Sequence, residues 1–418
     1  MVNVLNGTWI QRIAEILQNW YDVITGTGRD SFGRTRVSNT GQRLDVEFLY
    51  DKQSDYFDEV TTNGTVTFNA TSRDLTFSIS DANNGTIASM SSYPVPYTPG
   101  NSQLIDITGV LDPSEMNGTV QVFLRSNVTG TVTEQTIEQS SWTNFTSGVD
   151  WTLSHIFQID FQSLKVGSIR YNIVADGFPV QVAQIDNDNL RSTGYWEHAN
   201  LPVCWRLYND ATNTYMEACY GDENNAVGFR MVTTANQNAT MKAICCTVKS
   251  EGGGDLRNLG GLPRSIDNGE TPVTVDNTIT PILSIRPKAT FNSINNMILT
   301  IPKSYEIQTS EPIRFILIHN GTLTGASFTD VDTNQSSVEY DISATAITGG
   351  HEVVSGYLAA QSTGAAAGRF TNNQTGLLGK TYLWNRQGSE TGILTLAAIR
   401  TTVDNADVFS SLSWEEIR

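Results

Sequence analysis

The hydrophobic positions near the start of the chain follow a helical period. Between Thr8 and Ile24 the apolar residues recur at spacings of 3, 4, 3 and 4, and they are Ile10, Ile13, Leu17, Trp20 and Ile24. This heptad seam predicts an amphipathic helix that packs against partner helices. A helix this short, about four turns, is marginal alone in water. Its apolar side must therefore be buried, either on the chain's own β body or by copies of itself in an oligomer, for which a trimer is expected.

Beyond this helix, apolar and polar residues alternate, which is the period of a β-strand. The alternation is clear at 66–70, 75–79, 157–161 and 169–173, and similar patterns resume at Ile282 and run to the end of the chain. Asp176 and Gly177 follow one of these segments and favour a two-residue hairpin turn. Many short strands separated by turns are typical of a β-sandwich.

These patterns predict an all-β fold with two β-sandwich domains, jelly-roll or lectin-like, preceded by one short N-terminal amphipathic helix. The helix occupies residues 1–28 and the first sandwich 29–255. A cluster of glycines between Gly252 and Gly261, with little apolar content after it, predicts a linker at 256–280. The second sandwich then occupies 281–418.

Three pairs of residues are placed symmetrically about the turn at 210–213. A hairpin centred there would put the members of each pair opposite one another on one face, with complementary charges and stacked rings. The pairs are Cys204 and Cys219, Arg206 and Glu217, and Tyr208 and Tyr215. The chain has four cysteines without the spacing of a zinc site, so buried reduced thiols are the favoured state and a Cys204–Cys219 bridge is the alternative.

Composition narrows the class of partner. Hydrophobic residues make up 39% of the 418 and charged residues 17%, with a net charge of -17. A surface this negative repels phosphate backbones, so nucleic acid is not an expected partner. The first residues lack the basic start of a secretory signal, and no apolar run approaches the roughly 20 residues of a membrane helix. The chain is therefore expected to be made in the cytoplasm, without membrane insertion.

Several stretches, in order, resemble one family of tailed-phage and large DNA-virus virion structural proteins. The opening Asp30-Ser-Phe-Gly-Arg-Thr-Arg-Val37 is similar to the family's Asp-Ala-Phe-Gly-Arg-Leu-Arg-Val. Further matching stretches are Leu49–Gln53, Tyr97–Gln103, Ile107–Val110, Ser284–Ser293, Leu323–Phe328, Val338–Asp341 and Trp414–Arg418. The resemblance covers most of residues 30–418 and implies a component of a bacteriophage or virus particle. The heptad helix is not part of the shared pattern.

No catalytic motif is visible. The chain has four histidines and lacks a nucleophile elbow, a zincin helix, a dinucleotide fingerprint and a P-loop. We therefore expect no enzymatic activity; a carbohydrate-active enzyme is the third and least favoured hypothesis. No cofactor is expected, although Asp330, Asp332 and Asn334 have the spacing of a weak calcium candidate. A solvated turn, in which these side chains bond to the local backbone, is the favoured interpretation.

One stretch resembles a contact site, since it places large rings beside hydrogen-bonding groups in a polar loop. It comprises Tyr195, Trp196, Glu197, His198 and Asn200. Such residues could anchor a subunit interface or stack on a glycan, and the plain alternative is local packing of Trp196.

The sequence therefore predicts a non-enzymatic structural subunit of a virion. It would be an oligomeric capsid decoration or tail fibre protein, anchored by its helix to itself and to other virion proteins. The alternative is a tail or baseplate adhesin that recognises host-surface glycan during host attachment.

Overall fold

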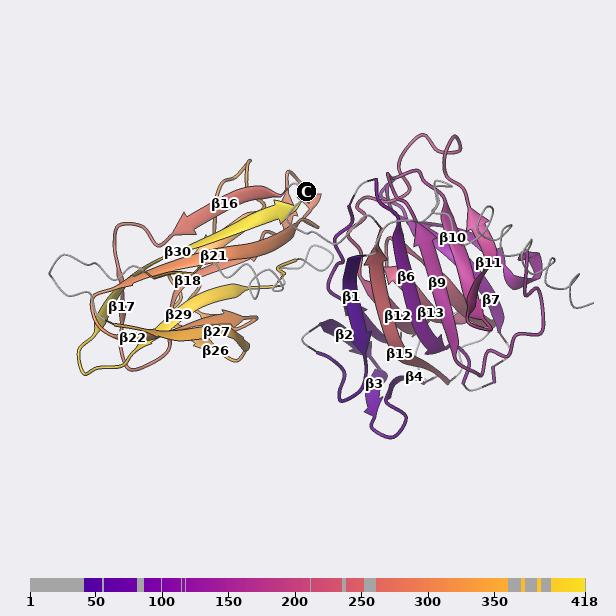
Figure 1. Ribbon diagram of the computed structural model, residues 1–418, viewed down its shortest axis with the longest axis horizontal. Coiled ribbons are helices and arrows are strands. Elements are labelled where there is room, and N and C mark those ends of the chain that lie inside the picture. The colour runs from indigo at the N-terminus through magenta and orange to yellow at the C-terminus, as the bar shows by residue number, and fades with distance from the viewer. Residues whose placement is uncertain are drawn as a thin grey trace, which may run out of the picture. The chain divides into compact units, whose positions relative to one another are not determined.

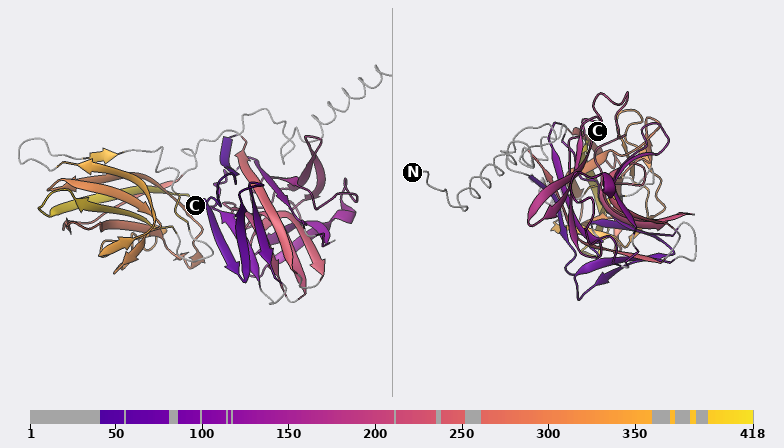
Figure 2. Two further views of the ribbon diagram at one scale, coloured as in Figure 1. Left: turned by 90° about the horizontal axis from the view of Figure 1, so that it is seen from below. Right: turned by 90° about the vertical axis from the view of Figure 1, so that its right-hand side faces the viewer.

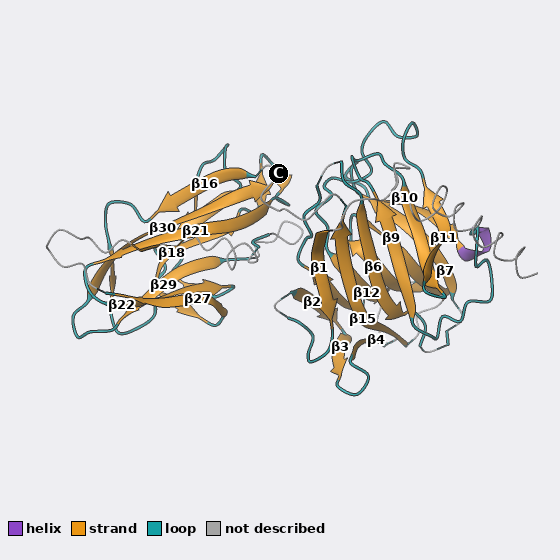
Figure 3. Ribbon diagram, in the orientation of Figure 1, coloured by secondary structure: helices purple, strands orange, loops and turns teal. Residues whose placement is uncertain are grey.

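The chain divides into two compact units, Met1–Asp255 and Leu256–Arg418. The computed structural model describes residues 41–417, except 55, 81–85, 99, 114, 117, 211, 235–237, 252–260, 360–369, 373–381 and 385–391. Within this part the chain is all-β, as predicted, with the short 3-10 helix η1 (Gln139–Ser141) and no α-helix (Figures 1 and 3). No helix among the described residues is long and apolar enough to cross a membrane. The predicted helix, with Ile10, Ile13, Leu17, Trp20 and Ile24, lies outside the described residues.

Unit 1 is a sandwich of two antiparallel sheets (Figures 1 and 2). The eight-stranded sheet contains, in spatial order, β11 (Phe178–Ile185), β10 (Ile169–Ala175), β9 (His155–Phe161), β6 (Gln103–Val110), β15 (Ala239–Ser250), β4 (Asp74–Ile79) and β3 (Gly64–Asn69), with β1 (Gly41–Glu47) also paired to β15. The seven-stranded sheet contains β2 (Phe57–Thr62), β5 (Ile87–Ser92), β12 (Val203–Asn209), β13 (Asn213–Gly221), β14 (Ala226–Thr234), β7 (Thr119–Ser126) and β8 (Thr133–Glu138).

The core of unit 1 lies between these sheets. Alternate residues of each strand point inward, so that Phe157 of β9 meets Phe229 of β14 with ring centroids 4.9 Å apart. The strand patterns expected at 66–69, 75–79, 157–161 and 169–173 are confirmed by β3, β4, β9 and β10. The hairpin turn after β10 is confirmed too, since Asp176 and Gly177 both have positive φ, of 51° and 81°.

Unit 2 is a smaller sandwich. One sheet contains β16 (Leu262–Asp267), β30 (Ala406–Ile417), β21 (Leu299–Thr309) and β28 (Phe370–Asn372), with β17 (Val273–Val275) also paired to β30. The other contains β24 (Thr329–Asp330), β25 (Val338–Asp341), β18 (Thr280–Pro287), β29 (Leu394–Arg400), β22 (Ile313–His319) and β27 (His351–Leu358). Two small hairpins add β19 (Thr290–Phe291) to β20 (Ile294–Asn295), and β23 (Thr322–Thr324) to β26 (Ala346–Thr348).

The predicted linker at 256–280 is wrong in part. Residues 262–267 and 273–275 form β16 and β17, which pair with β30 as part of unit 2. Ile266 packs against the core and Val275 is fully buried in it. The low apolar content is that of edge strands, which need to bury only one side. The low hydrophobicity of residues 262–275 therefore reflects strands at the edge of a sheet and not a segment without secondary structure.

Candidate functional site

In the loop at 195–200 the two large rings are packed inside unit 1, whereas Glu197 is exposed and His198 and Asn200 are half-buried. Tyr195 and Trp196 are 0% and 1% exposed and belong to the core of unit 1. The Trp196 ring lies edge-on to Phe161, with centroids 5.1 Å apart. Rings that the chain's own core encloses cannot stack on a glycan or anchor another subunit, so the predicted contact role of these two residues is wrong.

The polar members of this loop tie it to the rest of unit 1. Glu197 accepts a hydrogen bond from Asn225 Nδ2 at 3.1 Å, and its carbonyl accepts one from Lys165 Nζ at 3.0 Å. The side-chain oxygen of Asn200 accepts from the Tyr97 amide at 2.9 Å. His198 Nδ1 lies 3.1 Å from the Asn200 carbonyl, and burial lowers the pKa of His198 below its ordinary value, although Asp222 acts in the opposite direction. The loop is thus fastened by its polar groups as well as by its rings.

The calcium candidate in unit 2 is not a ligand set. Asp332 Oδ1 accepts hydrogen bonds from the backbone amides of Asn334 and Gln335 at 2.9 and 2.8 Å. Asp330 pairs with Lys288 at 3.1 Å. Among the described residues no group of three or more His, Cys, Asp or Glu side chains could hold a metal ion. Asp332 thus bonds to the local backbone, as the favoured interpretation expects, while Asp330 is paired with Lys288.

The same turn forms one wall of a shallow, open polar pocket of about 470 Å³. We call it the 288–339 pocket. Its lining is rich in hydroxyl, amide and carboxylate groups, with one aromatic ring. The lining residues are Lys288, Ala289, Thr290, Phe291, Asn292, Ser293, Asp330, Thr333, Asn334 and Glu339.

Local backbone chemistry builds the other wall. Phe291 and Ile294 pair across the β19–β20 hairpin, and its two-residue turn, Asn292-Ser293, has positive φ at both positions, 51° and 62°. The buried Asn296 side chain donates to the carbonyls of Lys288 and Ser337, each at 2.9 Å. This amide clamp holds the base of the hairpin against the start of β25, so the two walls of the pocket are fixed to each other.

Sequence reasoning reached one wall of this pocket and missed the other. Asp330 and Asn334 were identified, but for a metal. Lys288, Phe291 and Glu339 were not, because Phe291 and Glu339 lie on different strands, β19 and β25, and Lys288 lies between β18 and β19. The available signal was the Asn292-Ser293 pair between two short β-prone pairs, a hairpin turn that lacks the usual glycine.

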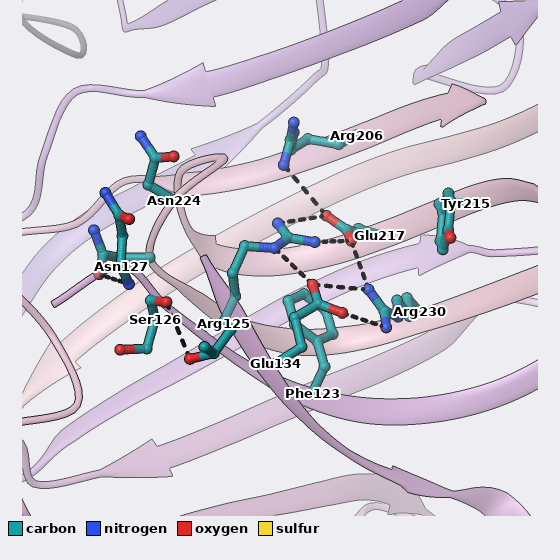
Figure 4. A network of polar contacts seen from close by, with 12 residues as sticks. Phe123, Arg125, Ser126, Asn127, Glu134, Arg206, Tyr215, Glu217, Asn224 and Arg230 are labelled. Atoms are coloured by element: carbon teal, nitrogen blue, oxygen red, sulfur yellow. Dashed lines mark hydrogen bonds and ion pairs between the residues drawn. The ribbon is translucent and has the colours of Figure 1, made fainter. Parts of the chain in front are cut away.

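A second polar cluster crosses the outer face of the seven-stranded sheet in unit 1 (Figure 4). We call it the Arg–Glu lattice, and its members are Arg125, Glu134, Arg206, Glu217 and Arg230. The residues next to them in sequence, such as Leu124, Leu207 and Ala218, point into the core. Because side chains alternate along a strand, the lattice lies on the opposite face.

Register brings the lattice together. Arg206, Glu217 and Arg230 are directly opposed on β12, β13 and β14. Arg125 reaches Glu217 at 2.6 Å and Glu134 at 2.7 Å, while Arg230 reaches Glu134 at 2.7 Å. The guanidinium groups of Arg125 and Arg230 also lie over the Phe123 ring, 5.1 and 5.0 Å from its centroid. Both acidic groups are thus held between cations.

The electrostatics of the lattice fix Glu217 as an anion. The side chain is fully buried, and burial by itself would raise its pKa, yet the attraction of Arg125 and the other two arginines lowers the pKa to about 2. The pKa of Arg125 is raised, since Glu217 outweighs the effect of burial. A carboxyl with so low a pKa is permanently ionised near neutrality and cannot serve as a general acid.

The hairpin predicted around the turn at 210–213 is confirmed. Cys204 faces Cys219, Arg206 faces Glu217 and Tyr208 faces Tyr215 in the register of β12 and β13. The tyrosine rings stack with centroids 4.8 Å apart. Cys204 and Cys219 form a disulfide, the alternative to the favoured reduced thiols.

Comparison with known proteins gives no family. No protein-family model and no curated protein matches the chain. The lectin UEA-II complexed with galactose is 11% identical with a TM-score of 0.21, and the Lotus tetragonolobus seed lectin 12% with 0.21; these matches cover 50% of this chain and 100% and 98% of those chains. The CBM22 tandem domain of Paenibacillus barcinonensis Xyn10C is 9% identical with a TM-score of 0.23, over 92% of this chain and 98% of that one. Similarities this low carry no argument about fold or ligand.

Proposed function

We propose that this chain is a non-enzymatic, glycan-recognising subunit exposed on a virus particle. The observation that carries the glycan part is the 288–339 pocket of unit 2. Sugar hydroxyls both donate and accept hydrogen bonds, and the pocket offers amides, hydroxyls and carboxylates that do the same. Phe291 adds an aromatic ring; the Lys288 ammonium lies over one face, 5.8 Å from the centroid, and the C–H side of a sugar can lie against the other.

The particle part of the proposal rests on the sequence resemblance to virion structural proteins. Two of the stretches that carry it, 284–293 and 338–341, contribute Lys288, Phe291 and Glu339 to the pocket. A lectin-like or jelly-roll form of the two sandwiches is the finer part of the same proposal.

A second candidate function is purely structural, a capsid decoration or fibre subunit that binds only itself and other virion proteins. The Arg–Glu lattice favours it, because ion pairs tie five strands of one sheet face together and hold the buried Glu217 as an anion. In both candidate functions unit 1 would act as a spacer. The two candidates differ in whether unit 2 binds a glycan.

Binding of the full-length chain to a panel of immobilised neutral and acidic glycans tests the proposal. We expect binding to some of them, weakened at least tenfold by Phe291→Ala and by Asn334→Ala. Asn295→Ala is the matched control, since this exposed asparagine lies on the same hairpin but does not line the pocket. Binding to no glycan, or equal loss in all three variants, would refute glycan recognition by the pocket and leave the structural candidate.

A further inference from the structure

We infer that the 288–339 pocket selects electrically neutral sugars and rejects sialylated, sulfated and uronic-acid glycans. The inference rests on the glycan recognition proposed above and specifies the ligand class of that same pocket. It follows from how the charges around the pocket are paired, which is a property separate from the hydrogen-bonding groups that suggested a sugar.

Each charged side chain that lines the pocket has an opposite charge beside it. Lys288 Nζ lies 3.1 Å from Asp330 Oδ2, and Glu339 Oε1 lies 2.6 Å from Arg286 Nε. Arg286 is held further by the Phe328 ring, whose centroid is 3.8 Å from the guanidinium carbon. Both cations beside the pocket, Lys288 and Arg286, are therefore already paired with a carboxylate. An acidic sugar would have to compete with that carboxylate for either of them.

Lys288 is the one cation among the residues that line the pocket, and it is fixed in place. It is 7% exposed. Besides its pairing with Asp330, its ammonium donates to the Asp332 carbonyl at 2.9 Å. A carboxylate or sulfate entering the pocket would have to break this arrangement and would leave Asp330 without its cation, which costs more than the new contact returns.

Asp332 adds a negative charge to the turn that forms the pocket wall. Its carboxylate accepts the amides of Asn334 and Gln335, and these bonds lower its pKa, so the group is ionised at neutral pH. The whole chain carries a net charge of -17. An acidic sugar would thus meet repulsion at short and at long range, a way of excluding the wrong ligand that neutral sugars do not experience.

The test compares matched probes on the full-length chain. Glycans ending in lactose are set against the same glycans capped as 3′-sialyllactose, and N-acetylglucosamine-terminated glycans against their 6-sulfated forms. We expect the acidic member of each pair to bind at least tenfold more weakly at low salt. Asn334→Ala should remove binding of the neutral member, which places it in the pocket.

Asp332→Asn sharpens the comparison. An asparagine keeps a side-chain oxygen for the two backbone amides but removes the charge. It should therefore reduce the ratio of the neutral-glycan affinity to the acidic-glycan affinity severalfold, while the affinity for the neutral probe stays unchanged. Asp276→Asn is the matched control, since Asp276 accepts the Thr278 amide at 2.7 Å in an equivalent turn, and it precedes β18 whereas the pocket follows it. It should leave the ratio unaltered.

The outcomes separate the two proposals. If acidic glycans bind as tightly as neutral ones, and Asn334→Ala abolishes both, the pocket recognises glycans but the inference of neutrality is wrong. If Asp332→Asn and Asp276→Asn change the ratio of neutral to acidic affinity equally, the inference is also wrong, because the selection would then come from the net charge of the chain and not from the pocket. If no probe of either kind binds, the proposed function fails and this inference fails with it.

Discussion

Trp196 lies edge-on to Phe161 and is 1% exposed, so its indole belongs to the core of unit 1. Trp196→Ala should therefore lower the free energy of unfolding of unit 1 by about 3–5 kcal/mol, the usual cost of removing a large buried ring. Urea unfolding followed by circular dichroism measures this. Phe178→Ala serves as a control, since that ring of unit 1 is 73% exposed and its removal should change stability by less than about 0.5 kcal/mol. An unchanged unfolding transition combined with weaker self-association would instead restore the interface role.

The same residue shows where sequence reasoning reaches its limit at this scale. Two aromatic residues flanked by Gly194 and Glu197 look like an exposed loop, because the local sequence does not reveal the partners that enclose them. Those partners, Phe161 and Tyr220, come from distant strands. The pocket residues Lys288, Phe291 and Glu339 were missed for the same reason: proximity in the fold is not written in their spacing along the chain.

At the scale of the strands, the Arg–Glu lattice depends on one buried carboxylate. Glu217→Ala would remove the buried anion that three guanidinium groups share and would leave Arg125 and Arg230 with Glu134 alone. We expect a loss of about 3–5 kcal/mol. Glu134→Ala is the milder comparison, because that side chain is 28% exposed and water can replace it. Since the folded pKa of Glu217 is about 2, below the ordinary 4.5, its contribution is complete above about pH 4.5 and is lost as the pH falls toward 2. Wild-type stability should decline across that interval more steeply than that of Glu217→Gln; parallel curves would contradict the assignment.

Strand periodicity and pair symmetry were the parts of the fold that the sequence revealed. The alternation of Leu75, Phe77 and Ile79 identified β4, and the mirrored residues around 210–213 fixed the register of β12 and β13. Alternation follows from one buried face, and mirrored pairs from direct cross-strand contact, so both are local signals. Edge strands such as β16 carry little of either, and which sheet a strand joins depends on contacts between distant segments.

The two units have separate cores, which matters for the molecule as a whole. The core of unit 1 comes from strands between Gly41 and Ser250, and that of unit 2 from strands after Leu262. The heptad helix predicted at the N-terminus lies outside the described residues. If it brings copies of the chain together, as the sequence argument proposes, the oligomer would multiply any weak contact made by unit 2 with a glycan-covered surface.

Oligomerisation through the heptad seam is accordingly a prediction for the full chain. Leu17→Asp combined with Trp20→Asp places carboxylates at core positions of the seam, where an unpaired buried charge costs several kcal/mol. The double variant should sediment as a monomer where the wild type sediments as a trimer, with an unchanged β-type circular dichroism spectrum. Gln11→Glu and Gln18→Glu together add the same charge away from the a and d positions and should leave the trimer intact. Identical sedimentation of wild type and double variant would show that the seam does not join subunits. In the double variant, multivalent glycan binding should fall because the trimer is lost, while the affinity of a single unit 2 for a soluble sugar stays the same.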